Sequence, residues 1–158
     1  MSLDTRAFRD ALGRFATGIC VISADVEGYG CFGMTVNSFA SVSLEPALVL
    51  WSLQKNSEML DAFNKAKFFG VNVLSHDQQD LSNQYAKKGD HELSADQYRI
   101  GSSGCPVLRE ALVSFECETN VIHDGGDHVI VIGRVLELCE RPTGEPLLFY
   151  RGGYRELR

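Results

Sequence analysis

Short apolar runs separated by turns that contain glycine or proline recur along the chain, which is the pattern of β-strands. The clearest runs are residues 19–23, 31–37, 47–53 and 68–74, and two longer runs flank the DGGD sequence at 124–127. Because glycine accepts the positive φ of tight turns, DGGD predicts a hairpin. Residues 47–53 are apolar on both faces, which predicts a central strand.

Three segments are predicted to be helical. Residues 4–16 carry an apolar stripe at helical spacing, which predicts an amphipathic helix. Asn56 or Ser57 can cap a second helix, and Ser75 with Gln78 forms the capping-box pattern that opens a third. The stretch between the third helix and the hairpin is predicted to be a long irregular loop.

These elements predict one domain spanning residues 1–158, with a β-rich fold of antiparallel strands and inserted helices. The simplest arrangement is a closed or nearly closed all-β barrel, and a β-sandwich is the alternative. At 158 residues the chain is long enough to bury a hydrophobic core without disulfides or metals.

Charge and cysteine content narrow the function classes. The net charge is −6 and no basic cluster exceeds the pair Lys87 and Lys88, which argues against a nucleic-acid partner. Five cysteines without a C-x-x-C spacing fit free thiols in a reducing compartment, so we expect a cytoplasmic protein. The apolar runs are too short to cross a membrane, and no signal peptide is recognisable.

The stretch GMTVNSFASVSLEP, residues 33–46, has an unusual strand face. Read as one extended segment, it places small polar side chains on one side, among them Thr35, Asn37, Ser41 and Ser43. Small side chains let a flat ligand approach the backbone, whose N–H and C=O groups can bond the polar edge of a heterocycle. The alternative is that these are ordinary strand and turn residues that hydrogen-bond one another.

A second polar group stands just before the second predicted helix. It consists of Ser52, Lys55, Asn56 and Ser57. A helix N-terminus carries unpaired N–H groups and partial positive charge, so hydroxyls, an amide and a cation beside it favour a phosphate. The small polar face of residues 33–46, which we call the polar floor, and the helix N-terminus would then hold the two ends of one nucleotide. The simpler alternative is a helix cap beside a solvated lysine.

The histidines and cysteines give weaker signals. His123 and His128 flank the hairpin turn, but two ligands without a third make a weak metal site, and we expect no metal. His128 opens a strand that continues Val-Ile-Val-Ile, which suggests either a chemical role or a buried structural one. Cys20, Cys31 and Cys117 alternate with apolar neighbours, which favours core packing.

Five separated blocks together resemble the flavin reductase family with the FMN-binding split-barrel fold. In chain order they are GRFATGICVIS, GMTVNSFASVSLEPALVLWSLQKNS, FFGVNVL, GDHVIVIGRV and PLLFYRGGYREL. The resemblance implies a split β-barrel and an NAD(P)H:flavin oxidoreductase that uses FMN or FAD with NADH or NADPH. It also implies a homodimer that supplies reduced flavin to a partner flavin-dependent monooxygenase. A non-catalytic flavin-binding or interaction module on the same barrel is the alternative.

The resemblance further implies a set of site residues. The segment that holds the isoalloxazine ring and ribityl chain is matched by Thr35, Val36, Asn37, Ser38 and Ser41. The segment that meets the phosphate is matched by Ser52, Lys55, Asn56 and Ser57. His128 matches a histidine beside the flavin and the nicotinamide, and Tyr154 matches an aromatic residue of the same cleft. The implied hydride transfer needs no acid–base pair, because the cofactors carry the reaction.

Overall fold

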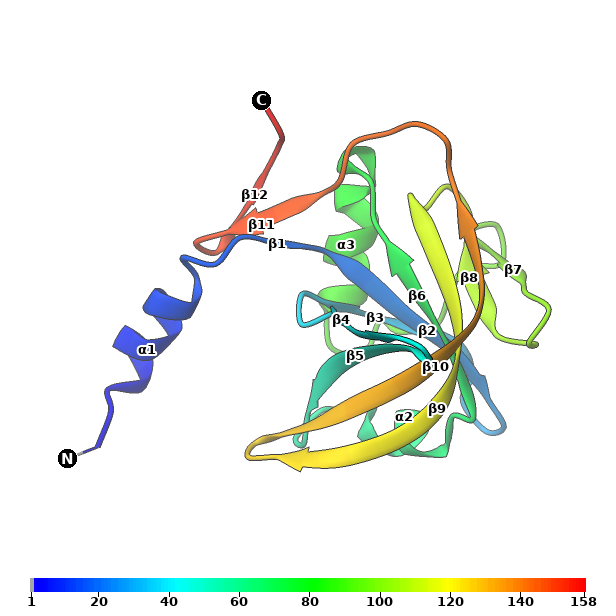
Figure 1. The fold of residues 1–158 in the computed structure, drawn as a ribbon, viewed down its shortest axis with the longest axis horizontal. Helices are drawn as coiled ribbons and strands as arrows, with labels where there is room; N and C mark the ends of the chain where they lie inside the picture. The colour runs from blue at the N-terminus through cyan, green and yellow to red at the C-terminus, as the bar shows by residue number, and fades with distance from the viewer. Residues whose placement is uncertain (1) are drawn as a thin grey trace.

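The computed structural model describes residues 2–158 and consists mainly of antiparallel strands (Figure 1). The helices are α1 (Thr5–Leu12), α2 (Leu60–Lys65) and α3 (Gln79–Ala86), the last preceded by the 3-10 turn η1 (His76–Gln78). The strands are β1 (Thr17–Gly18), β2 (Cys20–Val26), β3 (Gly30–Val36), β4 (Ala40–Leu44), β5 (Ala47–Gln54), β6 (Phe68–Val73), β7 (Tyr98–Ile100), β8 (Pro106–Leu108), β9 (Val113–Gly125), β10 (His128–Glu140), β11 (Leu148–Tyr150) and β12 (Gly153–Arg155).

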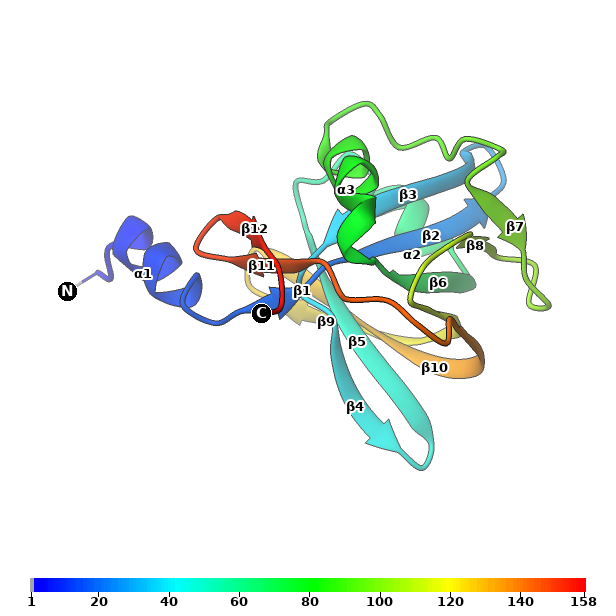
Figure 2. The same cartoon turned by 90° about the horizontal axis from the view of Figure 1, so that it is seen from above.

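Seven strands form one sheet in the order β3-β2-β6-β9-β10-β5-β4. The sheet curls around a common core into a barrel, which confirms the predicted β-rich barrel with inserted helices (Figures 1 and 2). The end strands β3 and β4 do not pair with each other, although they are joined directly by residues 37–39. We call the opening between them the seam. Two small sheets, β1-β11-β12 and β7-β8, flank the barrel.

Aromatic side chains from several elements meet inside the barrel. Trp51 of β5 is fully buried and packs edge-on against Phe63 of α2 and Phe69 of β6, with ring centroids 4.8 and 6.0 Å apart. Phe63 also meets Phe32 of β3 at 4.9 Å. Helix α2 thereby joins the core, and the burial of these large apolar rings is a principal stabilising contribution.

One polar side chain, Asn72 of β6, is buried in the middle of the sheet with all its hydrogen-bonding capacity used. Its amide nitrogen donates to the carbonyl of Val21 and the hydroxyl of Ser23, both at 2.9 Å. Its amide oxygen accepts from the Leu108 N–H and the Ser114 hydroxyl, both at 2.8 Å. Because a buried polar group is costly unless it is paired, this satisfied amide fixes the mutual positions of β2, β6, β8 and β9.

Most of the predicted strands and two of the three predicted core thiols are confirmed, whereas Cys31 is only partly buried. The predicted strands at residues 19–23, 31–37, 47–53 and 68–74 correspond to β2, β3, β5 and β6. The DGGD turn joins β9 to β10, and its Gly126 has a φ of 74°. Burial raises the pKa of Cys20 to about 12, and burial with smaller charge effects raises the pKa of Cys117 to about 12. Both thiols therefore stay protonated and act as small apolar groups.

Three predictions about strands are wrong in part. Residues 33–46 are not one extended segment, because β3 and β4 are separate strands and the alternation of faces stops between them. The stretch 88–108, predicted to be irregular, contains the β7–β8 hairpin. Strand β5 is not central, since it lies beside the end strand β4.

The N-terminal helix is shorter than predicted and projects from the barrel (Figure 1). Its first N–H groups are capped by Asp4, whose carboxylate accepts from the Arg6 N–H at 3.0 Å. None of the eight residues of α1 is buried, and Phe8 and Leu12 lie exposed on its surface. Within residues 2–158, no helix has the length and apolar character needed to span a membrane.

Candidate functional site

The free edge of β3 at the seam is covered along part of its length. Residues 91–93 lie against it, and the Gly33 N–H donates to the His91 carbonyl at 2.8 Å. In an antiparallel ladder, alternate residues present their N–H and C=O groups to the same edge. Thr35 is therefore the next residue to offer its backbone at this edge, beyond the segment that covers Gly33.

A serine hydroxyl holds the opposite side of the seam. Ser38 Oγ accepts from the Ser52 N–H at 2.9 Å and donates to the Ser52 carbonyl at 3.2 Å. Ser52 lies near the end of β5, so this hydroxyl takes the place of a neighbouring strand there. The two bonds fix the segment that joins β3 to β4 against the end of β5.

A cavity of about 490 Å³ opens where the ends of β3 and β5 meet the segment after α3. We call it the seam cavity. Its lining residues are Met34, Thr35, Val36, Asn37, Ser38, Ser52, Leu53, Gln54, Asn56, Ser57, Glu58, Ala86, Lys88, His91 and His128. Sites for small organic ligands have volumes on the order of 300–1,000 Å³ and combine apolar walls with a few polar groups, as this cavity does.

Eight of the eleven site residues named from the sequence line the seam cavity. These eight are Thr35, Val36, Asn37, Ser38, Ser52, Asn56, Ser57 and His128. They come from the end of β3, the end of β5, the turn after β5 and the start of β10. The structure thus brings the polar residues after β3 and the segment SLQKNS, residues 52–57, into one cavity.

Ser41, Lys55 and Tyr154 do not line the seam cavity. Ser41 is exposed on β4, opposite Val49 of β5. The Lys55 ammonium group forms an exposed ion pair with Asp124 at the end of β9. Lys55 is therefore directed toward the β9–β10 hairpin and not toward the cavity.

The predicted helix tip at Asn56 and Ser57 is wrong. Helix α2 begins at Leu60, so the argument from helix N–H groups and the helix dipole does not apply to the two residues. The Ser57 hydroxyl instead accepts from the Met59 N–H at 3.1 Å. Asn56 and Ser57 reach the seam cavity as residues of the turn between β5 and α2.

Helix α3 supports the floor of the seam cavity from outside. The Thr35 hydroxyl donates to the Ser82 carbonyl at 2.7 Å. The Tyr154 hydroxyl lies 2.8 Å from Ser82 Oγ and donates to Asn83 Oδ1 at 2.9 Å. Tyr154 therefore contacts α3, the helix that bonds Thr35, and does not itself line the seam cavity.

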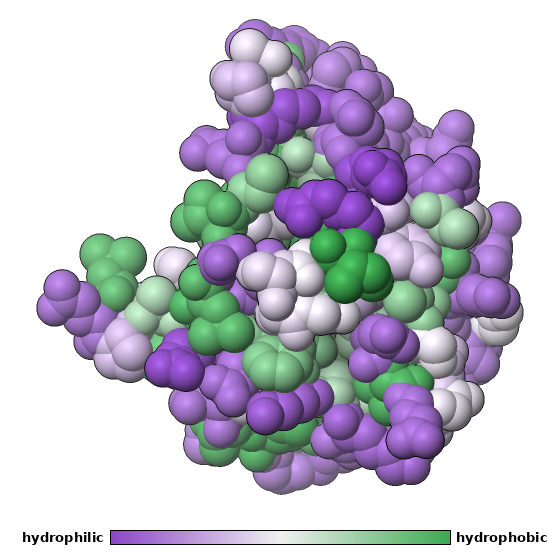
Figure 3. All heavy atoms as spheres, turned by 90° about the vertical axis from the view of Figure 1, so that its right-hand side faces the viewer, coloured by the Kyte–Doolittle hydropathy of each residue, from purple (hydrophilic) through white to green (hydrophobic). Residues whose placement is uncertain are grey.

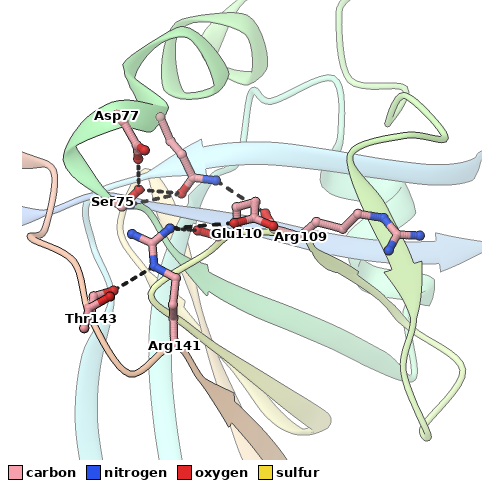
Figure 4. A network of polar contacts seen from close by, with 7 residues as sticks. Ser75, Asp77, Arg109, Glu110, Arg141 and Thr143 are labelled. Carbon is pink, nitrogen blue, oxygen red and sulfur yellow. Dashed lines mark hydrogen bonds and ion pairs between the residues drawn. The ribbon is translucent and has the colours of Figure 1, made fainter.

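A polar network fixes the start of α3 (Figure 4). The Ser75 N–H donates to Gln78 Oε1 at 3.0 Å, which confirms the predicted capping box. Gln78 Nε2 in turn donates to the Arg109 carbonyl at 3.4 Å, and the Arg141 guanidinium donates to the Glu110 carbonyl at 3.0 Å. The segments after β8 and β10 thus hold the helix that carries Ser82.

His128 lies between the seam cavity and a second, larger cavity of about 870 Å³. The second cavity is bounded by α1, the turn between β11 and β12, and the same Asn37 and His128 that line the seam cavity. His128 Nδ1 lies 2.6 Å from Asp127 Oδ1, and this hydrogen bond is the main cause that lowers the pKa of Asp127. The strand register pairs His123 with Ile130, so the two histidines of the hairpin are not opposite each other.

Sequence reasoning missed Glu58, Lys88 and His91, which also line the seam cavity. His91 Nε2 lies 2.8 Å from Glu58 Oε1, and His91 Nδ1 lies 3.0 Å from the Gly33 carbonyl. Lys88 and His91 belong to the stretch predicted to be irregular. Their position depends on long-range pairing with β3, which no local pattern reveals.

Comparison with known proteins agrees with the geometry. The model of the flavin reductase like domain matches residues 12–158. The chain is 45% identical over 151 residues to FMN reductase (NADH) SmoA of Agrobacterium fabrum, which covers 96% of this chain and 85% of that protein. It is 40% identical over 154 residues to HsaB of Mycobacterium tuberculosis, the reductase subunit of a flavin-dependent monooxygenase, covering 96% of this chain and 82% of that protein.

A solved structure is also similar to this chain. Flavin reductase PheA2 in its native state matches with a TM-score of 0.90 and 38% identity over 99% of both chains. The chain therefore belongs to the flavin reductase family, and its barrel is of the expected split type.

The Ser38 hydroxyl should matter for stability, because it pairs both backbone groups of Ser52. We expect Ser38→Ala to lower the free energy of unfolding by about 1 kcal/mol in a urea titration. Ser41→Ala is the matched control, since Ser41 is exposed, and its cost should stay within about 0.5 kcal/mol. Equal stability of the two variants would contradict the bridging role of Ser38.

Proposed function

We propose that this flavin reductase transfers hydride from NADH or NADPH to FMN or FAD held in the seam cavity, and that the reduced flavin serves a partner flavin-dependent monooxygenase. One observation carries the proposal. In a chain of this family, the seam cavity unites a free strand edge with a ring of hydroxyl and amide side chains. The monooxygenase partner is supported by the relative that is itself a reductase subunit of such an enzyme.

The seam cavity suits a flavin. The backbone at Thr35 offers N–H and C=O groups to the polar edge of a flat heterocycle, and the small side chains around it allow close approach. Bound flavin would supply the two-electron acceptor for the hydride. We assign the ring and ribityl chain to residues 35–38 and Ser52, and the phosphate to Asn56 and Ser57. Fixed N–H groups beside the ring would stabilise the negative charge that develops on reduction.

The second cavity suits the nicotinamide substrate. It shares Asn37 and His128 with the seam cavity, so a ligand in one cavity lies next to a ligand in the other. Arg9 and Arg151 line the second cavity and supply positive charge for a dinucleotide's phosphates. Hydride transfer needs two rings in contact, and placing them there is the main contribution of the protein.

A turnover assay distinguishes the enzyme from a non-catalytic flavin-binding module. The same assay on a His128→Ala variant tests the role of His128 in the reaction. We expect His128→Ala to lower kcat/KM for NADH tenfold or more, the loss of roughly 1.4–3 kcal/mol at the transition state. Oxidised-flavin affinity and Tm should remain nearly unchanged.

NADH absorbance at 340 nm with excess FMN provides the measurement. Oxidation of many NADH equivalents per wild-type chain supports the enzyme, whereas oxidation limited to bound flavin supports the module. Wild-type kinetics in the His128→Ala variant would show that His128 takes no part in the mechanism.

Exposed apolar surface supports a homodimer. Phe15 after α1 is 80% exposed and Leu44 at the tip of β4 is 93% exposed. Along β5 and β10 the inward residues are buried, yet the outward Leu50 and Ile132 are also apolar and half-buried. On the face that carries β7 and β8, by contrast, apolar and polar groups are interspersed (Figure 3). We therefore place the dimer contact on α1 and the outer face of β4, β5 and β10.

Light scattering at micromolar protein tests this assembly. We expect about twice the monomer mass of 17.5 kDa. The double substitution Phe15→Ser and Leu44→Ser should shift the mass toward the monomer, because it removes two exposed apolar side chains from the contact. A wild-type mass of 17.5 kDa would contradict the dimer.

Cysteine content supports a cytoplasmic location. All five cysteines are free thiols, and three of them, at positions 20, 105 and 117, are buried. Free thiols persist in a reducing compartment, which is also where NADH and NADPH are available.

A further inference from the structure

The seam cavity contains a cation that differs from the one the sequence suggests. Lys88 follows α3 and lines the cavity, whereas Lys55 pairs with Asp124 away from it. Within residues 2–158, Lys88 forms no ion pair. We propose that Lys88 is the phosphate-binding cation of the seam cavity and that it makes the site prefer phosphorylated flavins over riboflavin. This inference rests on the proposed function.

The segment that carries Lys88 is held in place on one side by Glu58. The Glu58 carboxylate accepts a hydrogen bond from the Gly89 N–H, the residue directly after Lys88. This bond is the largest of the causes that hold the pKa of Glu58 below its usual value. Glu58 follows Ser57 in the chain, so its contact with Gly89 brings Lys88 to the Asn56–Ser57 end of the cavity.

His91 holds the same segment on its other side. Its Nδ1 lies 3.0 Å from the Gly33 carbonyl and its Nε2 lies 2.8 Å from Glu58 Oε1. The His91 ring therefore bridges β3 and the turn before α2. Glu58 is thereby tied to the Lys88 segment through both Gly89 and His91.

The two lysines therefore have different roles in the same region. The Lys55 N–H donates to the Asp127 carbonyl at 2.9 Å and its ammonium group meets Asp124, so both ends of Lys55 serve the β9–β10 hairpin. Lys88 has an exposed side chain at the rim of the cavity. The backbone segment that carries it is anchored through Gly89 and His91. An ammonium group on a flexible stem binds a phosphate as a point charge, which needs proximity more than fixed geometry.

The experiment compares Lys88→Met with Lys55→Met, two substitutions of the same chemistry. Dissociation constants for FMN and riboflavin are measured by quenching of flavin fluorescence, in a phosphate-free buffer of low ionic strength. We expect Lys88→Met to weaken FMN binding about tenfold and to change riboflavin binding less than twofold. Lys55→Met should keep the wild-type ratio of the two constants within twofold, and Lys88→Arg should restore most of the FMN affinity.

The outcomes separate this inference from the proposed function. If wild-type protein binds neither flavin, the proposed function fails and the inference with it. If wild-type protein binds FMN more tightly than riboflavin but Lys88→Met keeps that ratio, or Lys55→Met loses it, the inference alone is overturned. Unchanged thermal unfolding of both variants, expected for exposed side chains, assigns any loss of affinity to the missing charge.

Discussion

The structure depends on a sheet that curls into a barrel without closing. Strands β3 and β4 are adjacent in the chain and form the two ends of the sheet, yet they do not pair. Backbone N–H and C=O groups at such an edge are costly when buried unpaired, so each must find another partner. Residues 91–93 cover part of β3, and the Ser38 hydroxyl covers the end of β5. The part between them, at Thr35, remains available to a ligand.

The surrounding elements hold the sides of this opening through hydrogen bonds. Asn72 joins four strands behind it through four hydrogen bonds, so the floor of the site stands on a fixed sheet. Helix α3 is tied at its start by the hydrogen bond from Gln78 to the Arg109 carbonyl, and it bonds Thr35 through the Ser82 carbonyl. A site built on strands and supported from behind holds its ligand groups in place before binding, which lowers the entropy cost of association.

The sequence predicts the strands and most of the candidate site, because both follow from local pattern. Short apolar runs between turn residues identify β2, β5 and β6, and the motif around Thr35 and Asn37 lies within one short segment. The errors concern contacts made over long distances. The acid partner of Lys55 is Asp124, and Lys88 reaches the cavity through the turn at Gly89, so neither role is visible from neighbouring residues.

Hydrogen exchange followed by mass spectrometry, with and without FMN, tests the central claim that the seam is the flavin site. The account predicts that FMN slows exchange in peptides covering residues 35–38 and 52–57, because all of these residues except Lys55 line the seam cavity. Peptides from β7 and β8, on another side of the barrel, should exchange at the same rate in both samples. Protection confined to the second cavity, or absent from residues 35–38, would contradict the account.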